Sequence, residues 1–440
     1  MKILFIHPNA SAKTRGNRSK SPFFVKILSK ITEFAPQIVF PVLASVTPEK
    51  HSITVINERF HDINFNDKYD IVGITSRTFE AKRAYEIADE FRKRGIIVIL
   101  GGWHPSALPE EAKRHADAVV LGEAEELWPQ ILNDVENGKL KPFYYQEKPV
   151  DFEKTLHPKR NILTGIFLAA GVQATKSCPY GCEYCALAYS RHGRIYRQRP
   201  VEEVVDEIRK IPQKIITFYD ASLTIDVKYT KSLFRELKNL NKKLICNGNI
   251  DVLSRDDELL KYAKEAGCIQ WNIGFESISE ESLREVKKRT NKVEYYQEAV
   301  KKIHEHGMSV TGLFMFGFDG DHVDVFKNTL DFIQKSGIDA ADFSILTPLP
   351  MTPLRDRLLK ENRVLTNDWS RYNFSKNVVF KPKNLTEEEL CVGVQNLYKN
   401  FYSASGIMIR SLKSIKRGGY QFFMVVIQNA FPRLVFKKIF

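Results

Sequence analysis

Short runs rich in β-branched residues alternate with helical patterns along most of the chain, and this alternation constrains the fold more than any other feature. It is typical of α/β proteins, in which helices connect the strands of a parallel sheet. In the first third, the pattern predicts a doubly wound, flavodoxin-like or Rossmann-like domain over residues 1–137. One helix is expected at 80–94, with Gly95 just past its end. Its strands are expected at 2–7, 52–57, 69–75, 96–100 and 116–121.

A second series of strands and helices follows a polar stretch that carries Pro142 and Pro149. We expect that stretch to be a linker, residues 138–165. The next strands are expected at 167–175, 214–219, 243–249, 269–275, 309–316 and 341–346. Six strands predict a partial (β/α)6 barrel over 166–357, because an eight-strand barrel would need more chain. A small helical region, 358–440, is expected to follow, with a helix near 386–402.

The chain has 440 residues, a net charge of +13 and six cysteines. Three of the cysteines crowd into one segment, which favours metal binding in a reducing compartment over a disulfide framework. Residues 1–9 show no signal-peptide pattern, so we expect a cytoplasmic protein. The basic excess lies in two places: residues 13–30, which we expect to be a charged loop, and the stretch after Glu389, which contains no acidic residue.

The C-terminal tail, residues 411–440, mixes these basic residues with clusters of aliphatic and aromatic side chains. Its apolar stretch is too short to cross a bilayer and is interrupted by Pro432. Two interpretations stay open. The tail is either an interfacial helix on an anionic membrane, which would suit a lipid-like substrate, or a solvated end or a helix that caps the barrel.

Cys178, Cys182 and Cys185 lie within eight residues, directly after an expected strand. Thiolates suit zinc and iron–sulfur clusters. A closed zinc site needs a fourth protein ligand, for which His192 is the candidate. Three ligands on a cubane cluster instead leave one iron open to a substrate. The other cysteines are isolated and are expected to be small buried side chains: Cys246, Cys268 and Cys391.

This segment, with Tyr184 before its last cysteine, resembles the Cys-x3-Cys-x2-Cys motif of the radical S-adenosylmethionine (SAM) superfamily, and the resemblance covers about 166–357. It implies that the three cysteines are the catalytic ligands of a [4Fe–4S] cluster whose open iron binds the methionine amine and carboxylate of SAM. It also implies that one-electron reduction cleaves the sulfonium and releases a 5′-deoxyadenosyl radical.

Three further landmarks resemble that family and imply contacts with SAM. Asp220, at the end of the second barrel strand, would hold the methionine amine. Glu276 and Ser277, after the fourth strand, would bind the ribose, since a carboxylate accepts two vicinal hydroxyl groups. Gly312 and Gly317 bound a fifth-strand segment whose backbone would flank the adenine.

In the first domain, three strand ends resemble the cobalamin-binding domain found ahead of the radical domain in one large subfamily. Thr75 and Ser76 follow the third strand, Gly101 and Gly102 the fourth, and Gly122 the fifth. The resemblance implies that the hydroxyl groups bind the cobalamin tail and that the glycines let the backbone approach it. The alternative is a domain kept for packing without the cofactor.

Histidine ligation of cobalt is not expected. The Asp-x-His-x2-Gly loop of other cobalamin proteins is absent after the first strand, so no histidine from that loop should reach the cobalt. His104, which precedes Pro105, is interpreted as a loop histidine near the tail pocket rather than a ligand.

The combined resemblance implies a cobalamin-dependent enzyme that methylates an unactivated carbon of a small-molecule or lipid-like substrate. Cyclisation, carbon–carbon coupling or oxidation without methyl transfer is the alternative, and a non-catalytic module ranks below it. A methylthiotransferase acting on nucleic acid is disfavoured, because residues 1–173 contain no cysteine. The expected partners are an external electron donor of the flavodoxin or ferredoxin type and, through the tail, a membrane surface.

Overall fold

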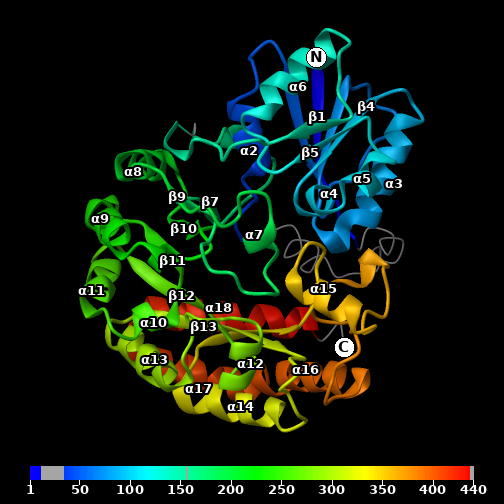
Figure 1. Cartoon of the computed structure of the whole chain (residues 1–440). Coiled ribbons are helices and arrows are strands. Elements are labelled where there is room, and N and C mark those ends of the chain that lie inside the picture. Colours follow the sequence, from blue (N-terminus) through cyan, green and yellow to red (C-terminus); the bar gives the residue numbers. More distant parts are fainter. Residues whose placement is uncertain (11–33, 155–156, 437–440) are drawn as a thin grey trace.

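The computed structural model describes residues 1–10, 34–154 and 157–436, and its two six-stranded sheets lie one above the other in Figure 1. The basic residues 13–30 lie outside the described residues. The upper sheet belongs to the N-terminal domain and the lower one to the barrel, with the C-terminal helices beside the barrel.

All strands of the N-terminal sheet are parallel, in the order β2-β1-β3-β4-β5-β6. The first five lie within two residues of their predicted positions, and their order is that of flavodoxin-like sheets. This confirms the doubly wound prediction. The strands are β1 (Lys2–His7), β2 (Ser52–Asn57), β3 (Ile71–Thr75), β4 (Ile97–Gly101), β5 (Ala118–Leu121) and β6 (Phe143–Tyr145).

The sixth strand corrects the predicted linker, because β6 lies inside 138–165 and pairs with β5. Tyr144 is its one buried residue, packs in the core with Trp128, and donates a 2.8 Å hydrogen bond to Asp134. A strand of three residues with one buried side chain has too little periodicity to be recognised in a polar stretch.

Helices cover both faces of this sheet, and each face has its own hydrophobic core. One core is built with α3 (Ala81–Arg92), which buries Ala84, Ile87, Ala88 and Phe91 as the spacing of these residues predicts. The helices on this face continue with α4 (Trp103–Ala107) and α5 (Pro109–Lys113). The other face is covered by α2 (Val39–Ser45) and α6 (Leu127–Glu136).

The barrel sheet is also all parallel, in the order β14-β13-β12-β11-β10-β7, which confirms a partial (β/α)6 barrel. The strands are β7 (Ala169–Val172), β10 (Ile215–Phe218), β11 (Lys243–Gly248), β12 (Cys268–Glu276), β13 (Ser309–Phe316) and β14 (Ala340–Ile345). A small antiparallel pair, β8 (Thr175–Lys176) and β9 (Arg197–Gln198), stands beside it.

The strand predicted at 167–175 is wrong in its second half. The buried Asp220 carboxylate accepts hydrogen bonds from the backbone N–H groups of Ala174 and Thr175 and, at 2.6 Å, from the Thr175 hydroxyl. These bonds draw the chain out of the barrel sheet after β7, so it pairs with β9 instead.

The helices of the barrel pack on the outer face of its sheet and share one continuous core with it. They are α8 (Val201–Lys210), α9 (Val227–Leu237), α10 (Ile250–Leu253), α11 (Asp257–Glu265), α12 (Glu280–Glu285), α13 (Tyr296–Glu305), α14 (Val325–Ser336) and α15 (Pro353–Lys360). The predicted boundary at 357/358 therefore falls inside α15. The short helix α7 (Ala186–Tyr189) follows Cys185 and lies between the two domains in Figure 1.

The C-terminal region is helical, as predicted, with α16 (Glu387–Phe401), α17 (Ala404–Ser414) and α18 (Gly419–Phe436). Thr386 begins α16 with a capping box that involves Glu389. From this helix, Tyr398 accepts a 3.0 Å hydrogen bond from the Phe343 N–H, so α16 packs on β14 like a helix of the barrel. Within the described ranges, no helix combines the length and apolar character that crossing a bilayer requires.

Partly buried ion pairs join the N-terminal domain to the β8–β9 pair of the barrel domain. Arg197 on β9 makes two 2.7 Å hydrogen bonds to the carboxylate of Glu123, which follows β5, and a 3.0 Å bond to the hydroxyl of Ser177. Lys176 pairs with Glu125 beside it. Burial opposes the charged form of Glu123, but Arg197 and Lys176 outweigh it and lower its pKa to about 2. Arg197 thus links the carboxyl end of β5 in the N-terminal sheet to Ser177, the residue that precedes Cys178.

A second contact between the domains is made by Trp369, in the short 3-10 helix Trp369–Arg371 that follows the barrel. Its indole N–H donates to the Glu111 carboxylate at 2.9 Å, and the same carboxylate contacts Tyr85 and His104. The C-terminal region therefore straps the N-terminal domain onto the barrel.

We expect Arg197→Met to lower the free energy of unfolding at pH 7 by about 2–3 kcal/mol, because the partly buried Glu123 loses its bidentate partner. The pKa of Glu123 is lower in the folded chain than its ordinary value of 4.5. Its stabilisation is therefore complete above about pH 5 and is lost as the pH falls toward 2. Urea unfolding of wild type and variant at pH 7 and pH 3.5 measures both effects, and their difference should shrink at the lower pH.

Arg209→Met is the matched control. Its partner is Asp206, and both side chains are largely exposed, so the change should cost less than about 0.5 kcal/mol at either pH. A difference between wild type and Arg197→Met that stays constant with pH would contradict the role given to the Glu123 ion pair.

Candidate functional site

The cysteine segment is a loop fixed at several points by backbone hydrogen bonds. The Cys178 N–H donates to Gly193 (2.9 Å), and the Glu183 N–H donates to Val286 at the end of α12 (3.0 Å). The Glu183 carbonyl accepts from Leu354 at the start of α15 (3.1 Å). The loop is thereby anchored to distant parts of the barrel before any ligand is bound.

Gly193 is required where the chain returns past α7, because a Cβ there would lie 1.7 Å from the Leu187 carbonyl oxygen. Two non-glycine residues in this region, Ser177 and His192, have φ values of 70° and 59°. The left-handed region is costly for such residues and persists only where surrounding contacts impose it. The loop is therefore tightly constrained on both sides of the cysteines.

The three thiols lie close enough to influence one another. Burial raises the pKa values of Cys178 and Cys182, the neighbouring Cys185 raises both further, and the nearby Lys288 lowers both. Among the described residues, no group of three His, Cys, Asp or Glu side chains is arranged to hold a metal ion as it stands. Three neighbouring thiols on one loop are the ligand type that iron–sulfur clusters use.

His192, the candidate fourth ligand of the alternative zinc site, contacts the N-terminal domain. Its Nε2 lies 3.1 Å from the backbone oxygen of Gln146. This ring nitrogen is therefore engaged in holding the loop against the N-terminal domain, which disfavours it as a zinc ligand.

A charged cluster stands beside the cysteines. Glu276 ends β12 in the left-handed region (φ 63°), and its carboxylate lies 3.0 Å from Lys288 Nζ. Tyr184 also hydrogen-bonds Glu276, and burial followed by the Glu276 charge raises the pKa of Tyr184 well above its ordinary value. Lys288 opposes the negative charge that three thiolates would create. Sequence reasoning missed Lys288, since it sits in an ordinary run of basic residues.

Two predicted SAM ligands have structural partners. Asp220 is fully buried under the start of the cysteine segment and, as described above, binds Ala174 and Thr175. Burial raises the pKa of Asp220 to about 6, although these hydrogen bonds oppose the shift. The Ser277 hydroxyl accepts the Ser279 N–H at 3.0 Å in the turn before α12. Of the predicted acidic and hydroxyl residues, Glu276 is the one the structure brings to the cysteines.

The predicted adenine-flanking glycines are packed against core side chains, and their role toward the adenine stays a prediction. A Cβ on Gly312 would lie 2.7 Å from the Phe314 ring, on the core side of β13. Gly317 has φ +106°, and a Cβ there would lie 2.9 Å from Leu390 of α16. Both glycines make room for core side chains, which a strand-end motif does not distinguish from room for a ligand.

A cavity of about 570 Å³ lies between the two domains, at the carboxyl ends of the N-terminal strands. The N-terminal domain contributes His7, Thr75, Ser76, Gly102, Trp103, Gly122 and Glu123, among others. The barrel contributes Ser177, Leu187, Ser190, Arg191 and Tyr219. Four of the five predicted cobalamin-binding residues therefore meet here, next to the residues that flank the cysteines.

The polar edge of this cavity is built for a ligand. Gly102 has φ +96°, and a Cβ there would lie 2.5 Å from Thr75 Oγ1 and 3.0 Å from the Ser76 nitrogen. Ser76 is 2% exposed, and its hydroxyl has no hydrogen-bond partner within the part of the chain that the structure describes. A buried hydroxyl without a partner beside a glycine cradle fits the nucleotide tail that the domain is expected to hold.

The two other predicted glycines of this domain, Gly122 and Gly101, differ in whether they line the cavity. Gly122 lines the cavity with φ +98°, and a Cβ there would lie 2.5 Å from Gln146 Oε1. Gly101 is the last residue of β4, points toward Val120 at 3.8 Å, and is not part of the cavity lining. The role of Gly101 in cofactor binding therefore stays a prediction, since a side chain there would meet only ordinary contact.

The two histidines near the cavity are both buried. His104 is fully buried, lies 3.1 Å from Glu111 and packs edge-on against Trp369, so it belongs to the strap between the domains. His7 ends β1 and packs against Phe40, and burial followed by the charge of Arg77 lowers its pKa to about 3. His7 therefore lines the cavity as a neutral ring, a role that sequence reasoning missed.

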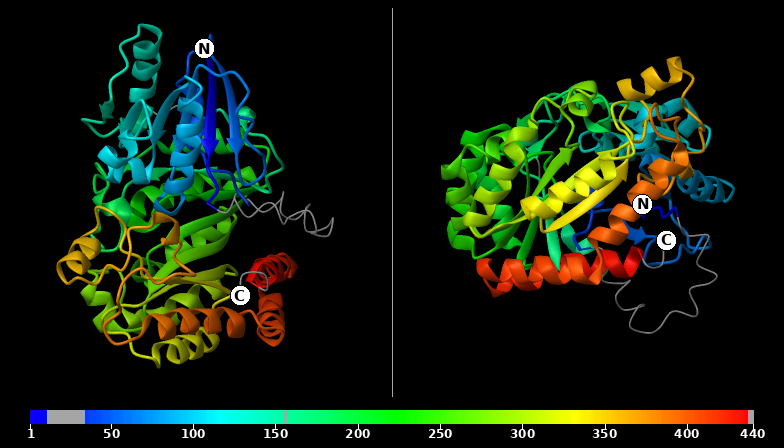
Figure 2. Two further views of the ribbon diagram at one scale, coloured as in Figure 1. Left: turned by 90° about the vertical axis from the view of Figure 1, so that its right-hand side faces the viewer. Right: turned by 90° about the horizontal axis from the view of Figure 1, so that it is seen from below.

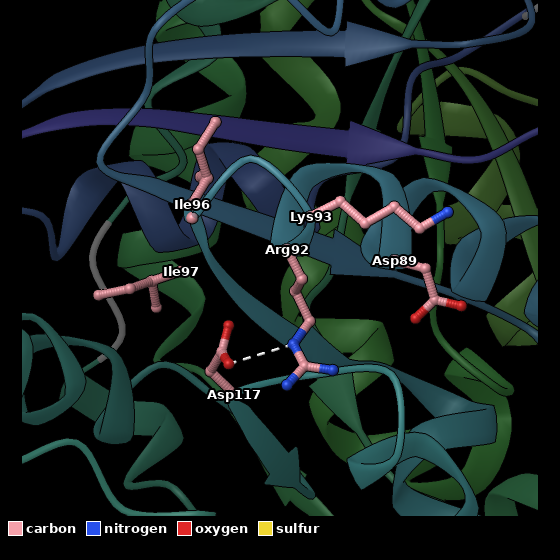
Figure 3. A pocket seen from close by; sticks show the side chains of 7 residues that line it. Asp89, Arg92, Lys93, Ile96, Ile97 and Asp117 are labelled. Atoms are coloured by element: carbon pink, nitrogen blue, oxygen red, sulfur yellow. Dashed lines mark hydrogen bonds and ion pairs between the residues drawn. The ribbon is translucent and has the colours of Figure 1, made fainter.

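A second hollow, of about 490 Å³, opens at the opposite edge of the N-terminal sheet, around Gly95 and the start of β4 (Figure 3). Its polar side chains include Arg92 and Asp117, which pair with each other at 3.1 Å. It lies at the amino ends of the strands, where doubly wound sheets do not hold their ligands. We assign no cofactor to it.

The residues present fit both expected cofactors. Three neighbouring thiols next to a cation suit an iron–sulfur cluster, and the glycine cradle with its free hydroxyl suits the cobalamin tail. Cys246 and Cys268 are fully buried beside each other, and Cys391 is half-buried on α16, so none of these three joins the site.

Comparison with known proteins agrees with this division of the chain. A family model described as the radical SAM superfamily matches residues 172–333. A second model, described as a B12 binding domain, matches residues 51–132. The two matches fall within the predicted barrel and the predicted cobalamin domain.

Two similar proteins come from Chlorobaculum tepidum. Bacteriochlorophyllide d C-12(1)-methyltransferase is 32% identical over 84% of this chain and 83% of its own length. Bacteriochlorophyllide d C-8(2)-methyltransferase is 31% identical over 84% of this chain and 86% of its own. Both relatives therefore span the two domains described here.

Among solved structures, the cobalamin-dependent SAM radical enzyme OxsB, with aqua-cobalamin and SAM bound, has the same fold. The TM-score is 0.70 at 15% identity, covering 97% of this chain and 71% of OxsB. With the motifs, the cavity and the relatives pointing the same way, the chain belongs to the radical SAM superfamily, in the group whose radical domain follows a cobalamin-binding domain.

Proposed function

We propose that this enzyme is a C-methyltransferase that acts on an unactivated carbon of a small molecule. One observation carries the proposal: the cavity that contains Thr75, Ser76 and Gly102 is also lined by Ser177 and Leu187, which flank the three cysteines. A methyl donor and a hydrogen-abstracting centre would then face the same space. Both relatives described above are named as methyltransferases of a bacteriochlorophyllide.

When bound, the cluster with SAM would supply hydrogen abstraction and cobalamin would supply the methyl group. The residues of the chain position these groups and shield them. The backbone bonds of the cysteine loop hold Cys178, Cys182 and Cys185 in place. Lys288 compensates negative charge at the thiolates, while Arg197 and Glu123 hold the cobalamin edge of the first sheet at the start of the cysteine segment. Burial between two domains limits access of water.

The inner face of the barrel carries both polar and apolar side chains. Along β13, Val310, Phe314 and Phe316 are buried against the helices, and Leu313, which alternates with them, is 38% exposed on the inner side. On the same inner side, Asn272 of β12 donates a 3.0 Å hydrogen bond to Asn247 of β11. Because the two relatives are named as acting on a bacteriochlorophyllide, which also combines apolar and polar groups, we propose a tetrapyrrole or a compound of similar character as the substrate.

Two further parts of the proposal concern partners. The reaction requires an external one-electron donor, for which we propose a protein of the flavodoxin or ferredoxin type. Peripheral contact of the C-terminal tail with a membrane, which the sequence left open, also stays a proposal.

Product analysis tests methyl transfer directly. The anaerobically reconstituted protein, given SAM, cobalamin, a strong reductant and a bacteriochlorophyllide, should form S-adenosylhomocysteine and 5′-deoxyadenosine together with a methylated product. Cys182→Ala should abolish all three, because two ligands do not hold the cluster, and should lose the charge-transfer absorbance of the reconstituted protein. The Cys391→Ala control, on α16, should keep both absorbance and products.

Formation of 5′-deoxyadenosine with a converted substrate but without S-adenosylhomocysteine would contradict methyl transfer. That outcome would favour cyclisation, coupling or oxidation by the same site.

The cobalamin cradle is tested by Gly102→Ala. We expect the variant to retain less than about one tenth of the cobalamin bound by wild type after desalting, because the new Cβ would collide with Thr75 Oγ1 and Ser76. Bound cobalamin is measured from visible absorbance, and folding from the thermal transition.

Gly95→Ala is the matched control in the same domain. Gly95 also has a positive φ (+75°), but a Cβ there meets nothing within 4 Å. It should lose about 1–2 kcal/mol from backbone strain alone and bind cobalamin like wild type. Equal loss of cobalamin in both variants would show that strain, and not the cradle, controls binding.

A further inference from the structure

The last two helices bury polar side chains and expose apolar ones, which reverses the usual pattern of a helix on a soluble domain. In α17, Arg410, Ser411 and Ser414 are buried. In α18, Gln421 and Asn429 are buried beside Met424 and Val425. The polar residues therefore face the protein, and most of the apolar surface of these helices is left outside.

The buried polar side chains attach α18 to the amino ends of the barrel strands. Gln421 donates to the Ile269 carbonyl at the start of β12 (3.0 Å), and Asn429 donates to the Asp339 carbonyl just before β14 (2.9 Å). Arg417 pairs with the Asp339 carboxylate. The helix thus caps the barrel, as one of the two interpretations of the tail predicts.

The outward face is unusually apolar for surface helices. On α17 and the residue that follows it, four apolar side chains between 50% and 59% exposed recur at helical spacing: Met408, Ile409, Leu412 and Ile415. On α18, the exposed apolar residues include three aromatic rings: Tyr420, Phe422, Phe423 and Ile427. We call these eight residues the outer face. Figure 2 shows both helices on the outside of the molecule. Exposed apolar clusters of this kind mark interaction sites.

The positive charge around the outer face indicates which kind of partner it binds. Lys413 and Lys416 are exposed among the residues of the outer face, and no acidic residue follows Glu389. A second copy of the chain would bring like charges together at a two-fold contact, which opposes self-association. An anionic lipid surface instead attracts the lysines while its acyl region receives the apolar side chains.

We propose that the outer face of α17 and α18 docks on an anionic lipid bilayer and lies in its interface. The aromatic side chains suit the headgroup level, where amphipathic rings concentrate. Because α18 covers the amino ends of the barrel strands, the contact is on the opposite end from the cysteine loop. The membrane therefore holds the enzyme in place and leaves the site and the N-terminal domain directed away from the lipid.

The test is co-sedimentation of the full-length protein with vesicles of phosphatidylcholine, or of phosphatidylcholine and phosphatidylglycerol in equal parts. Wild type should bind the anionic vesicles at least tenfold more strongly, and added salt should weaken the binding. The variant Leu412→Gln/Lys413→Gln should bind about tenfold more weakly than wild type. Both residues are exposed, so the change should leave the thermal transition and the reconstituted cluster unaltered.

The chain contains a matched control in the exposed pair Leu359 and Lys360 at the end of α15. The variant Leu359→Gln/Lys360→Gln removes the same chemical groups from a different surface and should bind like wild type. Equal weakening by both variants, absence of binding to anionic vesicles, or a dimer in light scattering that Leu412→Gln/Lys413→Gln dissociates would each overturn the proposal. Methyl transfer in solution is measured separately, so its failure does not decide the membrane contact.

Discussion

The contact of Arg197 with Glu123 and Ser177 is the constraint on which the arrangement of the site depends. Glu123 follows β5 of one sheet, and Ser177 precedes Cys178 of the other. A planar guanidinium can hold a carboxylate with two hydrogen bonds and still donate to a third group, which a lysine cannot do with fixed geometry. Arg197 therefore fixes the cavity and the cysteine loop relative to one another, with support from Lys176 and His192 on the same loop.

The sequence predicted most of the strands because buried parallel strands are short, β-branched and bounded by turn residues. The metal-binding role of the cysteines could be predicted equally well, because three thiols in a loop after a strand have few purely structural explanations. The role of each glycine was harder to predict. Gly102 and Gly122 serve the cavity, whereas Gly312 and Gly317 serve the core. The sequence shows that a side chain is missing but not what occupies its place.

Residues that act through long-range contacts could not be predicted. Lys288 and Arg197 are ordinary basic residues in the sequence. Lys288 gains its role from Glu276, 12 residues earlier, and Arg197 gains its role from Glu123, 74 residues earlier. Asp220 was recognised as notable, but burial turned its carboxylate toward the backbone of Ala174 and Thr175. The strand β6 was missed because a single buried tyrosine cannot produce the alternation of buried and exposed residues by which a strand is recognised.

The position of the cavity at the seam of two domains has a consequence for the room inside it. Its walls come from the N-terminal sheet and from the barrel, and the Trp369 strap together with the Arg197 ion pair closes the two against each other. Any movement that widens this cavity by separating the domains would break these contacts. The room available at the site is therefore coupled to the hydrogen bonds and ion pairs that cross the seam.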